Sequence, residues 1–85
     1  MYRVIVLPKA LEDLSGLDKA VAQRVSDKLT WLSEVIEDIP PLSLKGKFSG
    51  FYKLKIGDWR VIYEIHHDEK VVTVHKVGHR REIYK

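Results

Sequence analysis

The chain has 85 residues, which is enough for one small domain. It contains no cysteine, so disulfides, thiolate metal sites and thiol catalysis are excluded. Hydrophobic residues make up 45% and charged residues 32%, a balance typical of a globular fold rather than a disordered chain. No apolar run approaches the roughly 18 residues that span a bilayer, and no secretory signal is evident. We therefore expect one cytoplasmic domain over residues 1–85, with no membrane partner.

Charge is divided unevenly along the chain. Residues 1–44 carry five basic and seven acidic residues, whereas residues 45–85 carry ten basic and five acidic ones. The second half is therefore positive, which favours binding to a polyanion such as nucleic acid. A basic surface that is simply solvated is the alternative at this point.

The first half predicts a strand and two helical segments. Residues 2–7 form an apolar run, which predicts a strand that ends at Pro8. Residues 9–14 predict a short helical turn. A longer amphipathic helix is predicted next, from apolar residues at spacings of 4, 4, 3 and 4: Val21, Val25, Leu29, Leu32 and Ile36. Asp18 is placed to cap its start, and Pro40-Pro41 prevents its continuation.

After the prolines the apolar period changes to 2, which is typical of strands. Residues 45–50 predict a basic loop, and three strands are predicted at 51–56, 59–65 and 71–77, with Gly78 ending the last. The connections between these strands are short, so they predict an antiparallel meander. The order β-α-α-β-β-β predicts an α+β, two-layer domain in which a helical hairpin packs on the sheet. The first strand is expected at an edge or beside the last strand; the pattern allows both.

The predicted hairpin around Gly57-Asp58 gathers cations on one face of the sheet. A two-residue loop that begins with glycine suits a type II′ turn and sets Lys55 opposite Arg60. Lys53, Lys55 and Arg60 then share the face away from the apolar side chains. Like charges directly across two strands destabilise a sheet by several tenths of a kcal/mol, and a phosphate between them offsets that repulsion. The alternative is a solvated face on which Glu64 partly balances Arg60.

The C-terminal segment brings further polar groups toward this face. Residues 79–84 include His79, Arg80, Arg81 and Tyr84, and they follow the predicted third strand of the meander directly. Ile83 and Tyr84 are apolar, which indicates that the tail docks rather than frays. We expect its imidazole, guanidinium and phenol groups to lie near the cations of the hairpin.

Cations beside a titratable group suit the cleavage of RNA. The 2′-hydroxyl of RNA is the nucleophile, so a protein must only remove its proton, stabilise charge on the phosphate and protonate the leaving oxygen. A lysine can act as the base when neighbouring cations lower its pKa. No metal ion or other cofactor is expected, because the acidic residues of the second half are scattered. No glycine-rich phosphate loop and no nucleophile elbow is present.

Several motifs in this chain are together similar to those of one known family. They are Leu-Lys-Gly at 44–46, Tyr-Lys-Leu-Lys at 52–55, Gly-Asp-Trp-Arg-Val-Ile-Tyr at 57–63, Val-Gly-His-Arg at 77–80 and Tyr84. The sequence resembles the RelE/ParE superfamily of toxins from type II toxin–antitoxin modules over essentially its whole length. The resemblance implies a RelE-like fold. It also implies one of two activities, since RelE-like members cleave messenger RNA on the ribosome without a metal and ParE-like members poison DNA gyrase.

The lysines of the hairpin make the chain resemble the RelE branch, an mRNA interferase. That resemblance implies base catalysis and phosphate stabilisation by Lys53 and Lys55, phosphate binding by Arg60 and Arg80, and base stacking by Tyr84. His79 as a proton donor is a hypothesis of our own. Lys45, Lys47 and Arg81 are candidate contacts to RNA by charge alone.

The resemblance also implies partners. They are the ribosome, messenger RNA and a cognate RelB-like antitoxin that forms a hetero-oligomer with this chain. We expect the antitoxin to be acidic and partly disordered, and to block the cationic face. Two other functions remain open: a ParE-like gyrase inhibitor, and a non-catalytic RNA-binding module in which Phe48, Phe51 and Tyr84 stack on bases.

Overall fold

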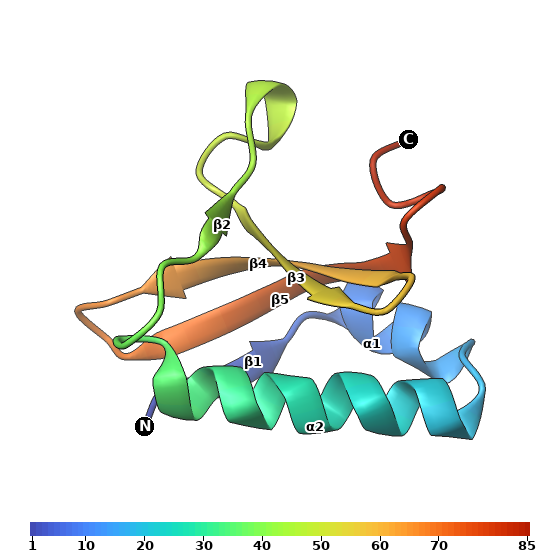
Figure 1. Ribbon diagram of the computed structural model, residues 1–85, viewed down its shortest axis with the longest axis horizontal. Coiled ribbons are helices and arrows are strands. Elements are labelled where there is room, and N and C mark those ends of the chain that lie inside the picture. The colour runs from blue at the N-terminus through green and yellow to red at the C-terminus, as the bar shows by residue number, and fades with distance from the viewer.

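Two helices cover one face of a five-stranded sheet in the computed structural model, which describes all residues 1–85 (Figure 1). The elements are β1 (Arg3–Val6), α1 (Pro8–Ser15), α2 (Lys19–Val35), β2 (Leu42–Ser43), a 3₁₀ turn (Gly46–Phe48), β3 (Tyr52–Ile56), β4 (Trp59–His66) and β5 (Val71–His79). The predicted α+β, two-layer architecture is confirmed. Neither helix is sufficiently long and apolar to cross a membrane.

The sheet has the order β1-β5-β4-β3-β2. Strands β3, β4 and β5 form the predicted antiparallel meander. The sequence allowed strand β1 to lie at an edge of the sheet or beside the last strand. Both are true, since β1 is an edge strand and the neighbour of β5. It runs parallel to β5, so the sheet is mixed rather than wholly antiparallel. The expectation of four strands was wrong by one, because β2 has only two residues, too few to show a period.

Two expected boundaries and one expected capping contact differ from those in the structure. Pro8 begins α1 rather than only ending β1, because the first helical position needs no N–H. Asp18 does occupy the N-cap of α2, but its side chain makes no capping hydrogen bond. Gly78 lies inside β5 rather than ending it. A glycine in a strand often marks a close approach by another segment, and here that segment is the C-terminal tail.

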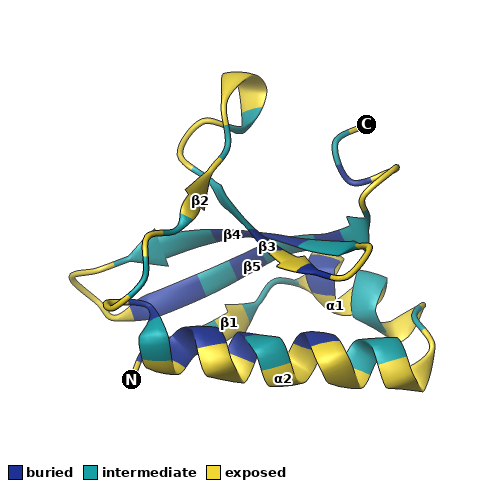
Figure 2. Cartoon of the chain, in the orientation of Figure 1, coloured by how far each residue is buried: buried dark blue, intermediate teal, exposed yellow.

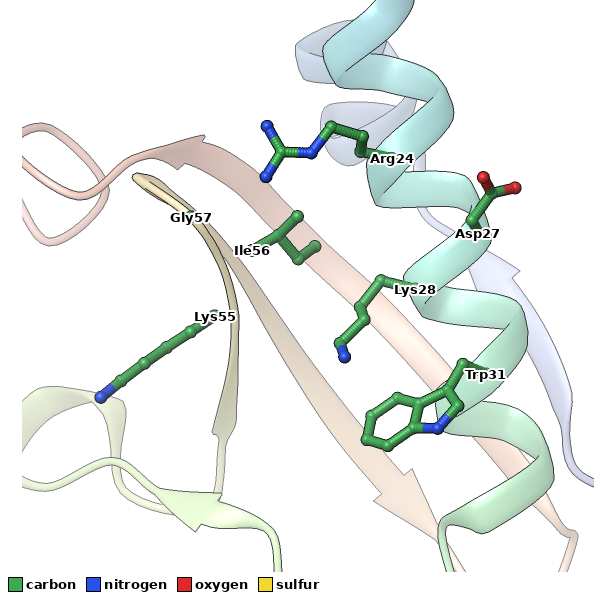
Figure 3. A pocket seen from close by; sticks show the side chains of 7 residues that line it. All are labelled: Arg24, Asp27, Lys28, Trp31, Lys55, Ile56 and Gly57. Carbon is green, nitrogen blue, oxygen red and sulfur yellow. The ribbon is translucent and has the colours of Figure 1, made fainter.

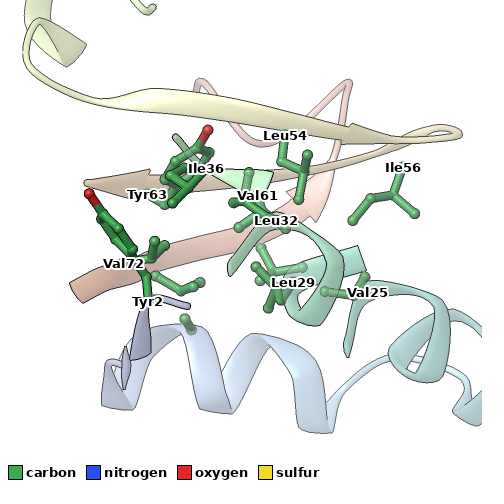
Figure 4. Close-up of a cluster of buried hydrophobic side chains, with 13 residues drawn as sticks. Tyr2, Val25, Leu29, Leu32, Ile36, Leu54, Ile56, Val61, Tyr63 and Val72 are labelled. Carbon is green, nitrogen blue, oxygen red and sulfur yellow. The ribbon is translucent and has the colours of Figure 1, made fainter. Parts of the chain in front are cut away.

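The apolar stripe of α2 forms the core with the facing side of the sheet (Figures 2 and 4). Val25, Leu29 and Leu32 are buried on the helix side. Val61 and Tyr63 are buried on the sheet side, with exposed fractions of 0% and 1%. Because side chains alternate along a strand, this packing forces the intervening residues of β3 and β4 onto the opposite face. The core therefore determines which side chains the candidate site contains.

Helix α1 covers the edge of the sheet beyond the end of β1. The backbone N–H of Leu7 donates to the carbonyl oxygen of Val74 at 3.0 Å, and the chain then turns into the helix. The backbone N–H of Val77 donates to the carboxylate of Asp13, also at 3.0 Å. A side chain of α1 thus replaces the missing neighbour strand, which blunts an edge that would otherwise be open to another chain.

Burial raises the pKa of Tyr63 to about 12, with a smaller contribution from Tyr52. Because the folded protein disfavours the phenolate, Tyr63 contributes stability that is present below pH 10 and is lost as the pH rises toward 12. Between pH 10 and pH 12, we expect the free energy of unfolding of the wild-type protein to fall by about 2 kcal/mol more than that of Tyr63→Phe, which lacks the phenol. Urea unfolding of both proteins across this range measures the difference. The same dependence of the unfolding free energy on pH in both proteins would contradict the prediction.

Candidate nucleic-acid interface

The face of the sheet turned away from the helices, hereafter the open face, carries the cations of the β3–β4 hairpin. The register sets Lys55 opposite Arg60 and Lys53 opposite Ile62, as predicted. Gly57 has φ of 59° and Asp58 does not have positive φ, as a type II′ turn requires. Figure 3 shows the Lys55 side chain extending away from α2. The turn and the core together place Lys53, Lys55 and Arg60 on one surface.

The guanidinium of Arg60 is held by its own turn. Its Nη1 donates to the carbonyl oxygen of Gly57 at 2.7 Å and to that of Trp59 at 2.8 Å. The other guanidinium nitrogens have no hydrogen-bond partner in the protein. Because the planar group is fixed on one side, it loses little conformational freedom when an anion binds on the other. The like charge of Lys55 directly across the strand pair adds to its attraction for an anion.

Arg80 is anchored beside the same turn. Its backbone N–H donates to the carbonyl oxygen of Asp58 at 2.8 Å, and its Nε lies 3.6 Å from the Asp58 carboxylate. Both side chains are more than half exposed, so water screens this ion pair strongly. The backbone contact is therefore the more important one, and it brings the first residue of the tail to the end of the hairpin that carries Arg60.

The tail docks on the open face at Gly78, as predicted from Ile83 and Tyr84. Ile83 is 3% exposed, and a Cβ on Gly78 would lie 3.1 Å from its Cδ1 atom. Gly78 is thus the position at which the strand admits another side chain. Lys76 adds a second attachment, since its Nζ donates to the carbonyl oxygen of Ile83 at 3.0 Å. Arg80 and Tyr84 therefore lie at the two ends of one short segment that is docked on the sheet.

An aromatic pair connects the tail to the 3₁₀ turn. The rings of Phe48 and Tyr84 meet edge to face, with centroids 5.9 Å apart. Figure 1 shows that both segments stand on the side of the sheet opposite to α2. The Tyr84 hydroxyl is buried and has no hydrogen-bond partner. Lys47 lies over the Phe48 ring at 5.4 Å from its centroid, so cations and aromatic rings alternate along this border of the open face.

The structure places His79 elsewhere than expected. It pairs with Trp59, and the two rings meet edge to face with centroids 5.4 Å apart. Trp59 packs against the core, so His79 lies on the helix-side face and not on the open face with Lys53 and Arg60. The expectation of a shared face was wrong because β5 continues through Gly78, and one more residue of strand reverses the direction of a side chain. The Nδ1 atom of His79 instead accepts a hydrogen bond from the backbone N–H of Arg81.

The three residues selected by charge alone are exposed and make no ion pair. Lys45 flanks the 3₁₀ turn, Lys47 lies within it, and Arg81 follows Arg80 in the tail. They belong to the two segments that rise above the open face and are available to an extended polyanion. No hydrogen bond of their side chains fixes them as the turn fixes Arg60.

Sequence reasoning missed two residues of the open face, His75 and Lys76. Ile62 pairs with Lys76 whereas Tyr63 pairs with Val74, so His75 is the extra residue of a β-bulge. The bulge puts both side chains on the open face between the buried Val74 and Val77. The signal was present in the sequence, because the apolar spacing in this strand changes from 2 to 3 at this point. Glu64 lies on the same face as Arg60, as expected, but its carboxylate is hydrogen-bonded to His75 Nε2 and forms no ion pair with Arg60.

A second basic surface lies on the helix side of the hairpin. Arg24, Lys28 and Trp31 of α2 face Ile56 and Gly57 across a groove of about 510 Å³ (Figure 3). The Lys28 ammonium lies 3.9 Å from the centre of the Trp31 ring. Asp27 and Lys55 also line this groove, so Lys55 borders both surfaces, but only the open face also holds the docked tail.

The open face is suited to binding a phosphate and an adjacent base. Arg60 and Arg80 supply guanidinium groups beside one turn, and Lys53 and Lys55 supply ammonium groups from the neighbouring strand. Phe48 and Tyr84 supply aromatic surface within the same face. No group of three or more histidine, aspartate or glutamate side chains is arranged to hold a metal ion.

One known family matches nearly the whole chain. Residues 4–84 match the family described as the ParE toxin of the type II toxin–antitoxin system parDE. The chain belongs to this family. No curated protein matches the sequence. The RelBE2 toxin–antitoxin complex from Mycobacterium tuberculosis shares the fold of this toxin, with 24% identity and a TM-score of 0.83 over 93% of this chain and 98% of that one.

Two further solved structures are similar to this toxin. The isolated RelE toxin of E. coli is 26% identical with a TM-score of 0.77, over 93% of this chain and 84% of that one. An archaeal RelE–RelB complex from Pyrococcus horikoshii is 27% identical with a TM-score of 0.72, over 95% of this chain and 97% of that one. The protein is therefore a type II toxin of the RelE/ParE superfamily with a RelE-like fold, and the predicted resemblance is confirmed.

Proposed function

We propose that this toxin is a metal-independent, ribosome-dependent endoribonuclease that cleaves messenger RNA and so inhibits translation. One observation carries the proposal: Lys53, Lys55 and Arg60 are gathered on the open face although the first two repel the third. Such an arrangement is favourable when a phosphate lies among the charges. Similarity to the E. coli RelE toxin supports the same reading.

The reaction requires one proton transfer at each side of the scissile phosphate. A base removes the proton of the 2′-hydroxyl, and the 2′-oxygen forms a bond to phosphorus. The bond from phosphorus to the 5′-oxygen then breaks, and that oxygen takes up a proton from a lysine ammonium or from water. The products are a 2′,3′-cyclic phosphate and a 5′-hydroxyl end. Lys53 and Lys55 are the candidates for the base, and we assign no step to His79 because it lies on the other face.

Negative charge accumulates on the phosphate as the new bond forms. Arg60, fixed by its turn, and Arg80, attached to the same turn, are the candidates to stabilise it. Charged donors that are already oriented lower the barrier most, because they need no reorganisation during the reaction. Tyr84 stacks on an adjacent base in this proposal, and Lys45, Lys47 and Arg81 contact the surrounding RNA of the ribosome.

The variant Arg80→Ala tests the proposal. We expect cleavage in a translation extract to fall by about 10²–10³-fold, because one charge-stabilising donor is lost. Lys19→Ala, which removes an exposed cation at the start of α2, is the matched control and should cleave normally. Sequencing of transcript ends with and without an inhibitor of translation initiation shows whether cutting depends on the ribosome. Full cleavage by Arg80→Ala would remove Arg80 from the mechanism.

Inhibition of DNA gyrase is the second candidate function. The matching family description names ParE, and the groove along α2 offers a second basic surface that shares Lys55 with the open face. A supercoiling assay with purified gyrase separates the two functions. Inhibition of gyrase without cutting of transcripts would favour this candidate, and salt-sensitive RNA binding with neither activity would indicate a non-catalytic RNA-binding module.

The toxin requires a partner that neutralises it. Two of the similar structures are toxin–antitoxin complexes. We propose a cognate RelB-like antitoxin with an acidic, amphipathic segment that covers the open face and forms a hetero-oligomer with this chain. Co-expression should restore growth that the toxin alone arrests. Normal growth on expression of the folded toxin alone would contradict the assignment of activity.

A further inference from the structure

A hollow of about 390 Å³ opens on the border of the open face between the 3₁₀ turn and β5. Its lining includes Phe48, Phe51, the imidazole of His75 and the buried side chain of Ile62. The Phe51 and His75 rings meet edge to face with centroids 4.9 Å apart. A volume of this size lies in the range of sites for small molecules, about 300–1,000 Å³.

Three cations also line this hollow: Lys9, Lys47 and Lys76. The carboxylates nearby are already engaged, since Asp13 accepts a hydrogen bond from Lys9 at 2.7 Å, Glu64 is hydrogen-bonded to His75, and Glu82 lies 3.6 Å from the ammonium of Lys85. The bond to Asp13 raises the pKa of Lys9, so this ammonium remains charged. An aromatic cavity with ammonium groups around it is complementary to a nucleobase that is attached to its phosphates.

Contacts behind the walls fix their orientation. Glu64 holds Nε2 of His75, which leaves Nδ1 without a partner in the protein and available to the edge of a base. Tyr84 packs against Phe48 from the tail side. The walls are therefore oriented before any ligand enters, which reduces the entropy lost on binding.

The hollow is continuous with the cationic face. Ile62 pairs with Lys53 on one side and with Lys76 on the other. Neighbouring strands lie about 4.8 Å apart, so two strand spacings separate the Lys53 backbone from that of Lys76. A single strand of RNA whose phosphate contacts Lys53 and Arg60 therefore has a neighbouring nucleotide close to the hollow.

We infer that the hollow between Phe48, Phe51 and His75 receives one unstacked base of single-stranded RNA and selects which sequences are cut. This inference rests on the proposed function. The base enters between the aromatic walls, its edge meets His75, and the ammonium groups of Lys47 and Lys76 hold the adjoining phosphates. The hollow is thus a specificity site beside the cationic face rather than part of the reacting centre.

The variants His75→Ala and Phe51→Leu test this inference. In a translation extract, we expect each to reduce cutting at the preferred sequences by about 5- to 100-fold, which is the effect of losing one stacked base. Cutting at disfavoured sequences should change little, so the preference for a base at one position relative to the cut should flatten. Leu11→Ala, which truncates an aliphatic side chain of α1 that is 59% exposed, is the control and should keep the normal profile.

A binding measurement separates failure of this inference from failure of the proposed function. Fluorescence anisotropy with short RNA homopolymers of each base, in the Arg80→Ala background, reports base preference without cleavage. A preference that His75→Ala abolishes supports the site even if no transcript is ever cut. An unaltered profile in both folded variants, or an equal loss at every sequence, overturns the inference while leaving the nuclease proposal intact.

Discussion

Replacement of both hairpin lysines, Lys53→Ala with Lys55→Ala, is expected to lower ribosome-dependent cleavage by about 10³-fold or more. Proton transfer by a positioned base contributes about 10²–10⁴-fold to such reactions, and the change also removes two charges that attract the phosphate. Sequencing of transcript ends in a translation extract measures the loss. Undiminished cleavage by the double variant would end the proposed mechanism.

The stability of the same variant distinguishes a functional role from a structural one. Lys55 faces Arg60 directly, and relief of this like-charge contact stabilises a sheet by about 0.2–1 kcal/mol. We therefore expect the free energy of unfolding to stay constant or rise while activity is lost. Arg3→Ala with Lys19→Ala removes two exposed cations, one from β1 and one from α2, and is the matched control, with normal cleavage expected.

Loss of the tail anchor is expected to have the second largest effect. Ile83→Ala removes a side chain that is 3% exposed and packs on Gly78. The tail should then detach, because little else than the Lys76 contact and the Phe48 ring holds its end. We expect cleavage to fall toward the level of Arg80→Ala, by about 10²-fold, since Tyr84 loses its position and Arg80 keeps only its contacts with Asp58. Hydrogen exchange of residues 81–85 should rise sharply while that of β4 stays slow.

Gly78→Val disrupts the same contact by changing the glycine on which Ile83 packs. The added side chain occupies the space of Ile83, whose nearest atom already lies 3.1 Å from a Cβ at this position. It should reproduce the loss of cleavage without removing any functional group. Leu11→Ala, which truncates an aliphatic side chain that is 59% exposed, is the control. Wild-type cleavage with a demonstrably detached tail would show that Arg80 acts without anchoring.

The hairpin and the helix stripe are the parts of this protein that sequence could predict. The register of β3 and β4 follows from a two-residue turn that begins with glycine, and no distant contact is needed to set it. The α2 stripe follows from helical periodicity, and burial of that stripe determines which face of the hairpin is covered. The cationic row of Lys53, Lys55 and Arg60 is therefore a local property of the sequence.

Other features depended on contacts between residues distant in sequence. The parallel pairing of β1 with β5 joins residues more than 65 positions apart, and no local period encodes it. The side of the sheet on which His79 lies depended on whether β5 continued through Gly78, which the docking of Ile83 explains. The hollow between Phe48, Phe51 and His75 exists only because a bulge turns two successive side chains of β5 outward beside the 3₁₀ turn.

The sequence by itself determined the two-layer class, the long helix and the cations that share one side of the hairpin, because hydrophobic periodicity and a short turn act over neighbouring residues. Only the tertiary structure decided the partner of the first strand, the path of the tail and the side chains that surround the hollow. These depend on packing between distant segments, where a single glycine or an extra residue in a strand changes which groups meet.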